Sequence, residues 1–372
     1  MLCNSLTWLS RVSLGLLVAA SAIPLWRTGN WLVRICDFPR VQILLLLSIP
    51  LVASTYCLTF DSTRRREHAV LLTIVLLTAI WQSSHILPFT PLWTKEIANG
   101  SSADAIRLMV ANVEVENRQC ATVLQQIKSE DPDVLLLIEI DDHWHAALQE
   151  LNASYPYRKE EVRGDGLGIA LWSKPELKSA EIQFLVSERR PSIFAEIRMP
   201  DGQTAKFVGV HPTPPGLNDS TDGGRRNSRV RDAELMHIAR EVQSNPSTPW
   251  IVAGDFNDVA WSHTTRLFKR TSGLCDPRIG RALLNTYHAD FPLLRYPIDQ
   301  LFLSEGSTIQ SLRRVRLRGS DHFAIVAEFQ VDATNSPSTV SPRDESEAEQ
   351  LIREGEENAE QRNVQAGDAD RY

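Results

Sequence analysis

Two long apolar segments near the N-terminus most constrain what this chain can fold into. Residues 41–60 (VQILLLLSIPLVASTYCLTF) run for 20 positions without a charge, and residues 69–93 run for 25 positions whose one titratable side chain is His85. A helix of roughly 20 apolar residues crosses the hydrocarbon core of a bilayer, and a proline such as Pro50 is tolerated inside such a helix. The sequence therefore predicts a membrane region over residues 1–100.

A third, shorter apolar segment covers residues 12–26, between Arg11 and Arg27. It extends to residue 6 if the long side chain of Arg11 reaches the interface, and the region then has about three transmembrane helices. The same segment also fits a cleaved signal peptide, with Ala20-Ser21-Ala22 as the cleavage site. The two later segments anchor the chain in either case. A soluble alternative, with these segments as core helices, fits leucine-rich runs of this length poorly.

The arginines between the apolar segments give conflicting signals about orientation. The short loop 61–68 contains Arg64, Arg65 and Arg66, and arginine-rich short loops favour the cytoplasmic side. The rest of the chain would then lie on the extracytoplasmic side. The first loop, which would also lie outside, carries three further arginines: Arg27, Arg34 and Arg40. We give more weight to the dense triplet and predict a multi-pass membrane protein whose main domain is extracytoplasmic.

The formal net charge of −7 comes from the end of the chain. Residues 331–372 contain 11 acidic side chains and 4 arginines, so the remaining residues sum to zero. A neutral domain lacks a general basic field for nucleic acid, although a local basic patch or a metal ion can still hold a polyanion. The terminal stretch has few apolar residues and is predicted to be a disordered acidic tail. The five cysteines show no metal-ligand spacing and leave open only a Cys120–Cys275 bridge.

Residues 101–330 alternate short apolar runs with helical patterns, which indicates a layered α/β domain with sheets covered by helices. The runs are rich in Val, Ile and Phe, as strands are. The predicted strands are 106–113, 133–139, 168–173, 192–198, 205–211, 250–256, 297–304 and 322–329. The predicted helices are 117–130, 142–151 and 228–243, of which the last has an apolar stripe at helical spacing.

Polar side chains that suit a metal ion or a phosphate stand at the ends of these apolar runs. Alone, each is better explained as a turn or helix-cap residue. Together they share one placement, and strand ends at one edge of a sheet meet on one surface. Buried carboxylates there need a partner, and hard oxygen ligands suit a divalent cation. We therefore predict one site formed by Asn112, Glu139, His211, Asp255, Asn257, Asp299, Asp321 and His322.

The motifs GDFN (residues 254–257), PID (297–299) and GSDH (319–322), with Glu139 after an apolar strand, resemble the endonuclease/exonuclease/phosphatase superfamily. That superfamily includes DNase I-like nucleases, abasic-site endonucleases, bacterial sphingomyelinases and inositol polyphosphate 5-phosphatases. The resemblance covers residues 104–329, and the preceding membrane region is similar to that of a bacterial branch. It implies a four-layer α/β sandwich, in which two packed β-sheets are flanked by helices.

The resemblance also implies a metal site. Glu139 would be the main Mg²⁺ ligand, with Mn²⁺ as an alternative ion. Asp321 would assist the metal or the water, and Asn112 would support the metal-binding carboxylate and the phosphate.

The remaining residues receive catalytic roles from the resemblance. His211 would be a phosphate contact or general acid. Asp255 would orient or deprotonate the attacking water, and Asn257 would hold the phosphate. Asp299 would orient His322, which would contact the phosphate or act as the base.

Two features depart from the family pattern or stand outside it. Ile138 precedes the metal-binding glutamate, where many members have glutamine. The loop 212–229 is rich in proline and glycine and contains Arg225, Arg226 and Arg229. It is either a solvated loop or a mobile cationic flap that binds the substrate phosphate.

Three functions fit these observations. The first is a membrane-anchored nuclease, for which Arg189-Arg190 and the run from Arg313 to Arg318 would form a basic groove; the run is equally a strand edge protected by charge. The second is a phosphoesterase that acts on the phosphodiester or phosphomonoester of a phospholipid or inositol phosphate, and anchoring beside lipid favours this hypothesis slightly. The third is a non-catalytic membrane adaptor that retains the fold. The bilayer is the one partner that the sequence indicates.

Overall fold

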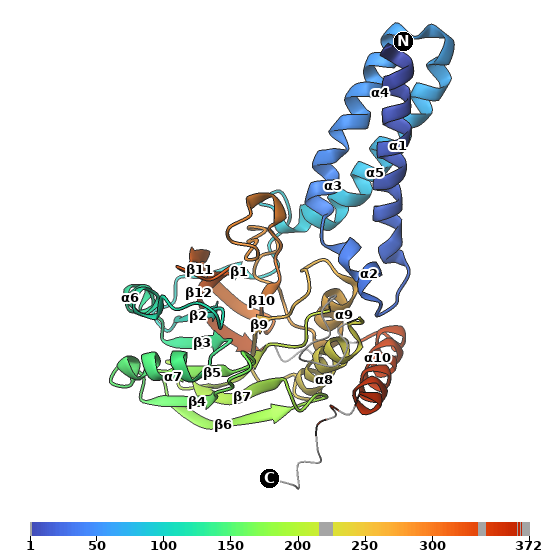
Figure 1. Cartoon of the computed structure of the whole chain (residues 1–372). Helices are drawn as coiled ribbons and strands as arrows, with labels where there is room; N and C mark the ends of the chain where they lie inside the picture. Colours follow the sequence, from blue (N-terminus) through green and yellow to red (C-terminus); the bar gives the residue numbers. More distant parts are fainter. Residues whose placement is uncertain (1, 216–225, 334–339, 363, 365, 367–372) are drawn as a thin grey trace.

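The structure, a computed structural model, describes residues 2–215, 226–333, 340–362, 364 and 366. A bundle of long helices projects from an α/β domain (Figure 1). The bundle consists of α1 (Leu2–Ala22), α3 (Arg40–Leu46) continued by α4 (Ser48–Phe60), and α5 (Arg65–Ile86). Three helical stretches are long and apolar enough to cross a membrane: Cys3–Leu25, Arg40–Phe60 and Ser62–Phe89.

The outer surface of the bundle is apolar. Its interior is a small cluster around Leu14, Leu47 and Val75, whereas large apolar side chains such as Leu16 and Leu77 are exposed on its outside. Arg11, inside the first stretch, forms an ion pair with Glu67 at 2.5 Å. An exterior of this kind is stable in lipid and unfavourable in water.

The α/β domain contains two packed β-sheets. The first has the strand order β1-β11-β12-β2-β3-β5-β4, and the second has the order β10-β9-β8-β7-β6. The bounds are β1 (Ala98–Asn99), β2 (Ile106–Asn112), β3 (Val134–Ile138), β4 (Tyr157–Glu161), β5 (Ile169–Ser173), β6 (Leu177–Phe184), β7 (Pro191–Arg198), β8 (Thr204–Val210), β9 (Trp250–Asp255), β10 (Asp299–Leu303), β11 (Gly306–Arg316) and β12 (Phe323–Ala333). All eight predicted strands are present, and each begins within two residues of its predicted start.

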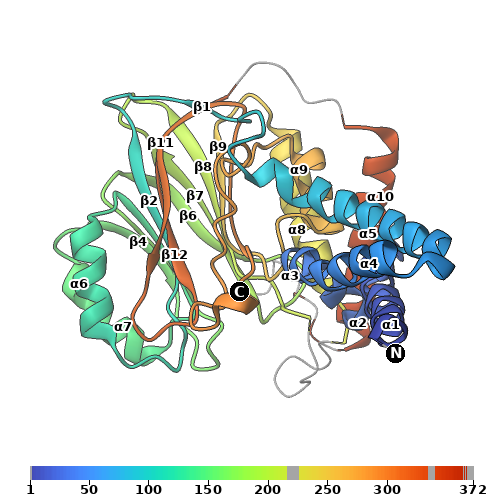
Figure 2. The same cartoon turned by 90° about the horizontal axis from the view of Figure 1, so that it is seen from above.

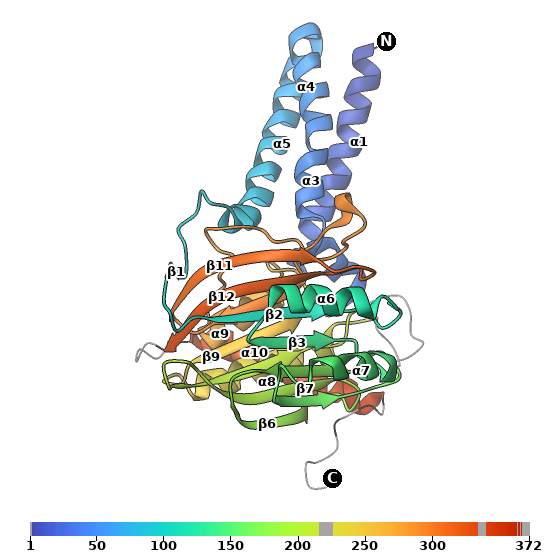
Figure 3. The same ribbon diagram turned by 90° about the vertical axis from the view of Figure 1, so that its left-hand side faces the viewer.

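Helices cover the outer faces of both sheets (Figure 2). The first sheet is covered by α6 (Cys120–Glu130) and α7 (Asp142–Leu148), and the second by α8 (Arg229–Ser244) and α9 (His263–Ser272). The main core lies between the sheets, around Leu136, Phe207 and Phe329. The predicted four-layer α/β sandwich is therefore confirmed, and Figure 3 shows the first sheet with α6 and α7 on its outer side. All five cysteines are free, so the Cys120–Cys275 bridge does not form.

The prediction of a disordered acidic tail is wrong for residues 342–361. They form α10 (Pro342–Gln361), which begins at the N-cap Ser341 and packs on α8. Its buried residues recur at helical spacing: Ala348, Ile352, Gly355 and Ala359. Its acids pair with basic side chains of the domain, as in Arg240–Glu349 at 2.9 Å and Arg270–Asp344 at 2.8 Å. The total apolar content of a segment is too coarse a measure to predict disorder. One narrow stripe of apolar side chains is enough to pack a helix against a domain.

Replacing Gly355 with valine is expected to detach α10 from the domain. A Cβ atom at this position would lie 2.2 Å from the Cβ of Ala233 and 2.6 Å from the carbonyl oxygen of Arg229. Overpacking of this kind destabilises by about 1–3 kcal/mol, measurable as a lower melting temperature and faster proteolysis of α10. Glu357→Val places the same side chain on the exposed face of α10 and serves as the control. Equal effects of both variants would contradict the packing explanation.

Candidate active site

The eight predicted site residues gather at one end of the two sheets. Six of them line a cavity of about 780 Å³: Glu139, His211, Asp255, Asn257, Asp321 and His322. The other two, Asn112 and Asp299, are buried directly behind the lining and bond to it. The residues come from the ends of six strands across both sheets, so the fold brings together side chains that are up to 210 positions apart.

Asn112 connects the two sheets at the site. Its side-chain nitrogen donates to Glu139 Oε1 at 2.9 Å and contacts Asp255 Oδ2 at 3.3 Å. The parallel pairing of β2 with β3 places Asn112 beside Ile138 and therefore next to Glu139. The amide of Val115 donates to the second carboxylate oxygen of Glu139 at 3.3 Å. Two carboxylates from different sheets are thus held close together by one amide.

His322 is held by Asp299. Its Nδ1 lies 2.9 Å from Asp299 Oδ2, while its Nε2 faces the cavity, 3.7 Å from Asp255 Oδ2 and 3.8 Å from Asp321 Oδ1. His211 lies on the other side of Asp255, with its Nε2 4.0 Å from the same Oδ2 atom and 3.8 Å from Glu139 Oε1. Both imidazoles therefore present Nε2 to the same group of carboxylates.

The two central groups have shifted proton affinities. Burial and the nearby charge of Asp299 raise the pKa of Asp255 well above the usual range for a carboxyl group. Burial alone would lower the pKa of His322, but Asp299, Asp255 and Asp321 outweigh it and raise the pKa to about 10. The three carboxylates therefore favour the protonated, cationic form of His322. Between the two roles that the family resemblance offers for His322, this charge favours phosphate contact over the role of base.

Unusual backbone geometry is concentrated at the site. Glu114, Glu139 and Asn257 all have positive φ angles, of 61°, 68° and 51°. Such angles are costly for residues other than glycine, and they persist where the surrounding structure fixes them. Here Asn257 is held by its amide, which donates to Asp255 Oδ1 at 2.8 Å, and by its side chain, which donates to the carbonyl of Pro212 at 2.9 Å. All three residues line the cavity.

The side chains fit a divalent cation. Six carboxylates line the cavity: Glu114, Glu116, Glu139, Asp165, Asp255 and Asp321. Among the described residues that line it, Arg190 is the one lysine or arginine. Oxygen-rich clusters with excess negative charge bind hard cations. Asp255, Asp299 and His322 also offer possible ligand atoms within 4.8 Å of one another, although Asp299 already bonds to His322.

Within the described residues, the predicted cationic flap contributes no arginine to the cavity. Arg225 lies outside the described residues. Arg226 and Arg229 are not part of the cavity lining, and Arg229 faces α10, where its Nε lies 3.6 Å from Glu354. Helix α8 begins at Arg229 and turns it away from the site. The cavity arginine is instead Arg190, whose guanidinium lies 3.5 Å from His211 Nδ1.

The arginine run 313–318 covers the last four residues of strand β11 (Gly306–Arg316) and the two that follow, and it does not line the cavity. Arg313 pairs with Glu130, and Arg316 pairs with Asp290 at 2.5 Å. Arg314 stacks on the ring of Phe323, 4.5 Å from its centroid. The structure therefore supports the interpretation of this run as a strand edge protected by charge, and not as part of a basic groove.

One wall of the cavity comes from the membrane region, which the sequence did not indicate. Trp31, Ile35, Phe38 and Pro39 line the cavity together with the catalytic candidates. They belong to the segment 26–39 between α1 and α3, which we call the membrane-proximal loop. It contains α2 (Trp31–Arg34) and is bound to the domain by backbone hydrogen bonds, such as Ser228 N to Gly29 O at 2.8 Å.

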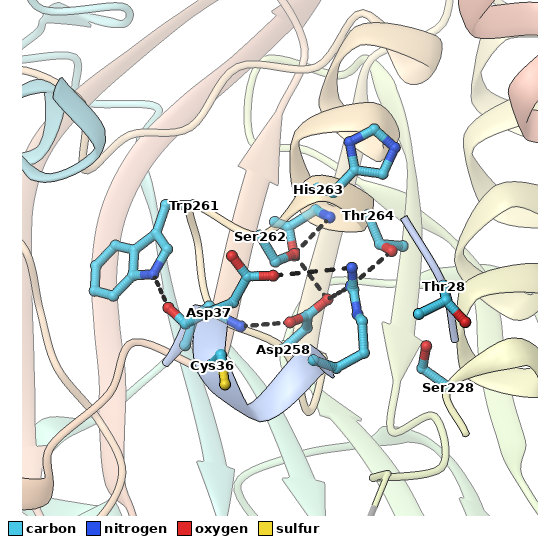
Figure 4. A network of polar contacts seen from close by, with 12 residues as sticks. Thr28, Cys36, Asp37, Ser228, Asp258, Trp261, Ser262, His263 and Thr264 are labelled. Carbon is cyan, nitrogen blue, oxygen red and sulfur yellow. Dashed lines mark hydrogen bonds and ion pairs between the residues drawn. The ribbon is translucent and has the colours of Figure 1, made fainter. Parts of the chain in front are cut away.

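A buried ionic network fixes this loop beside the GDFN segment. Arg34 donates to Asp258 Oδ2 and to Thr264 Oγ1, both at 2.9 Å. Arg231 binds the same Asp258 carboxylate at 3.0 Å. Figure 4 shows Asp37, Asp258, Ser262 and Thr264 of this network together, with Trp261 donating to the carbonyl of Asp37. The buried charges are balanced between three arginines and three aspartates: Arg34, Arg40, Arg231, Asp37, Asp232 and Asp258.

Replacing Arg34 with methionine is expected to destabilise the protein by about 3–5 kcal/mol, because two arginines then face three buried aspartates and one buried negative charge is left uncompensated. The readout is thermal unfolding of the full chain in detergent. Arg27→Met is the control, since the Arg27–Glu347 pair is half exposed at Arg27 and contributes at most about 1 kcal/mol. A small loss from both variants would show that the network does not hold the loop.

Comparison with known proteins was made for sequence and structure. The sequence model described as "Endonuclease/Exonuclease/phosphatase family" matches residues 109–322, more than half of the chain. No curated protein matches the sequence. Among solved structures, the chain is similar to D. rerio TDP2 humanized by 14 mutations, with 16% identity over 62% of this chain and 100% of that chain and a TM-score of 0.49.

Two further structures show comparable similarity. The catalytic domain of human Nocturnin with bound sulfate has 18% identity over 62% of this chain and 96% of that chain, with a TM-score of 0.49. An endonuclease/exonuclease/phosphatase from Bacteroides vulgatus has 18% identity over 61% of this chain and 99% of that chain, also with a TM-score of 0.49.

Proposed function

Because this chain belongs to the endonuclease/exonuclease/phosphatase family, whose members are metal-dependent phosphoesterases, we propose that it is a membrane-anchored enzyme that hydrolyses phosphodiester bonds with Mg²⁺ or Mn²⁺. One observation carries the proposal. The Asp299–His322 pair, Asp255 and Glu139 meet in a single cavity, with the histidine 3.7 Å from the Asp255 carboxylate.

The residues of the cavity have separable tasks in this reaction. Glu139, with Asp321 and Asn112 beside it, would hold the divalent cation, which neutralises phosphate charge and polarises phosphorus when bound. Asp255, whose pKa is raised by burial and by Asp299, accepts a proton from the attacking water. His322 stays cationic and binds a non-bridging phosphate oxygen.

The other side of the phosphate is served by further groups. Asn257 holds the phosphate in place. His211 protonates the leaving oxygen, which is the acid role that the family resemblance offers it. Arg190, next to His211 at 3.5 Å, adds positive charge where the leaving group departs.

The membrane anchor is proposed to be the three-helix bundle, with the catalytic domain on the extracytoplasmic side. The loop that carries Arg64, Arg65 and Arg66 lies at the end of the bundle far from the domain (Figure 1). The competing arginines of the first loop have partners in the folded protein: Arg27 with Glu347, Arg34 with Asp258, and Arg40 with Asp37. Their presence thus has a structural reason, and the triplet is the better guide to orientation.

The test is cleavage of bis(p-nitrophenyl) phosphate by the full chain in detergent. Turnover is expected with Mg²⁺ or Mn²⁺, none with EDTA, and none in His322→Ala. A protein that binds Mn²⁺ but has no turnover would be the non-catalytic adaptor. Digestion of α10 by protease added to intact cells tests the orientation, and protection of α10 would place the domain in the cytoplasm.

A further inference from the structure

The catalytic cavity has an acidic end and an apolar wall. The acidic end is the carboxylate cluster of the site, and the wall is formed by Trp31, Ile35, Phe38 and Pro39 of the membrane-proximal loop. Ile35 is 52% exposed although it lines the cavity, so its side chain has apolar surface available for a ligand. Small-molecule sites commonly combine apolar walls with a few polar groups that fix the orientation.

A second apolar segment connects this cavity with the start of a membrane helix. Tyr287 and Tyr296 line the cavity, and the residues between them present Phe291, Leu293 and Leu294 with exposures of 57%, 77% and 53%. The carbonyl of Leu293 accepts a hydrogen bond of 2.7 Å from Gln42, two residues into the stretch Arg40–Phe60. This segment, residues 288–295, therefore lies at the level where the apolar bundle begins.

Exposed aromatic and apolar side chains surround that level. Trp26 follows the first membrane stretch with 75% exposure, and Leu92 and Trp93 follow the third with 85% and 48%. Aromatic residues of this kind gather at the boundary between lipid and water. Together with residues 288–295, they place the mouth of the cavity at the membrane surface.

The charges of the cavity disfavour a long polyanion. Binding of nucleic acid relies on several lysines or arginines along the backbone path, whereas Arg190 is the one such residue among the described lining. The arginines of β11 are engaged with Glu130, Asp290 and Phe323. A substrate with one phosphate and an apolar remainder suits this cavity better.

We propose, building on the phosphodiesterase function above, that the substrate is a membrane lipid with a phosphodiester headgroup, whose apolar part lies against the membrane-proximal loop. In hydrolysis, the water oxygen forms a bond to phosphorus and the bond from phosphorus to one ester oxygen breaks. The proton of the water leaves through Asp255, and the leaving oxygen takes a proton from His211. The products are an alcohol and a phosphomonoester, one of which stays in the bilayer.

The test compares lipid and soluble diesters with the full chain in nanodiscs. The lipids are phosphatidylglycerol, phosphatidylcholine, phosphatidylethanolamine and sphingomyelin, each paired with its headgroup diester lacking long chains. For at least one pair, kcat/KM for the lipid is expected to exceed that for its headgroup diester by about 100-fold. A ratio of this size corresponds to the transfer of a few methylene groups of the lipid from water to the apolar wall. Turnover of bis(p-nitrophenyl) phosphate without any lipid preference overturns the lipid proposal alone. No turnover of any diester overturns the proposed function itself.

Two variants of the membrane-proximal loop provide the matched comparison. Ile35→Ser is expected to lower kcat/KM for the preferred lipid about tenfold, through a loss of apolar surface, and to lower kcat/KM for bis(p-nitrophenyl) phosphate by a smaller factor. Leu32→Ser, three residues away and outside the cavity lining, is expected to change neither. Equal loss with both substrates in Ile35→Ser, or faster cleavage of single-stranded DNA than of any lipid, contradicts the proposal.

Discussion

Replacing Glu139 with glutamine is expected to lower metal-dependent diester hydrolysis by about a thousandfold or more, because the bound cation contributes several kcal/mol to the transition state. Glutamine has nearly the same size as glutamate. In one of the two orientations of its amide group, its oxygen still accepts the hydrogen bond from Asn112. The substitution removes the charge that holds the cation. The measurement is kcat/KM for bis(p-nitrophenyl) phosphate, together with Mn²⁺ affinity by calorimetry.

Glu116→Gln is the matched control for this prediction. Glu116 is one of the six carboxylates of the same cavity but is exposed, unlike the half-buried Glu139. The same chemical change there is expected to leave both Mn²⁺ affinity and turnover nearly unchanged. If Glu139→Gln bound Mn²⁺ as tightly as the unmodified protein, the cation would have to be held elsewhere, for example by Asp255, Asp299 and His322.

Replacing Asp299 with asparagine is expected to lower the rate about 10²–10³-fold, the range for loss of one preorganised group that stabilises charge in the transition state. Asp299 is 1% exposed and bonds to Nδ1 of His322, so its charge both orients the imidazole and keeps it protonated. A raised histidine pKa means that the cation is present at low pH and lost as the pH rises through that pKa. Without Asp299 the pKa falls, so the basic limb of the pH–rate profile moves to lower pH.

Asp276→Asn separates this effect from a general loss of stability. Asp276 is as buried as Asp299 and pairs with Arg278 at 2.6 Å, outside the cavity lining. This variant is expected to unfold at a lower temperature without a change in the shape of the pH–rate profile. A pH–rate profile of Asp299→Asn that matched the unmodified protein would remove the role assigned to the Asp299–His322 pair.

Much of the fold and the gathering of the site followed from the placement of polar residues at the ends of apolar runs. Asn112, Glu139 and Asp255 each directly follow or end a largely buried strand, and a buried carboxylate needs neighbours that satisfy it. Each of these residues can be recognised from its local sequence, and together they indicate a single site in the folded protein. The strands that the sequence analysis missed, such as β4 and β6, lie at sheet edges, where half-exposed residues show no apolar run.

Other parts depend on contacts between distant segments and leave little trace in local sequence. Arg34 reads as one more arginine in a loop, and only the fold shows that it binds Asp258, 224 positions later. Arg190 gives no signal that separates it from Arg189. The stripe of α10 was visible in the sequence as small residues at helical spacing, and a search for periodicity instead of composition would have found it.

The membrane-proximal loop makes the catalytic cavity a product of two regions of the chain. A soluble fragment that begins at residue 101 would retain every catalytic side chain and yet lose Trp31, Ile35, Phe38 and Pro39 from the cavity. Two proteins with identical catalytic domains but different first loops would then differ in which compounds they accept. In this architecture, substitutions in the anchor region can change substrate selectivity while the reaction stays the same.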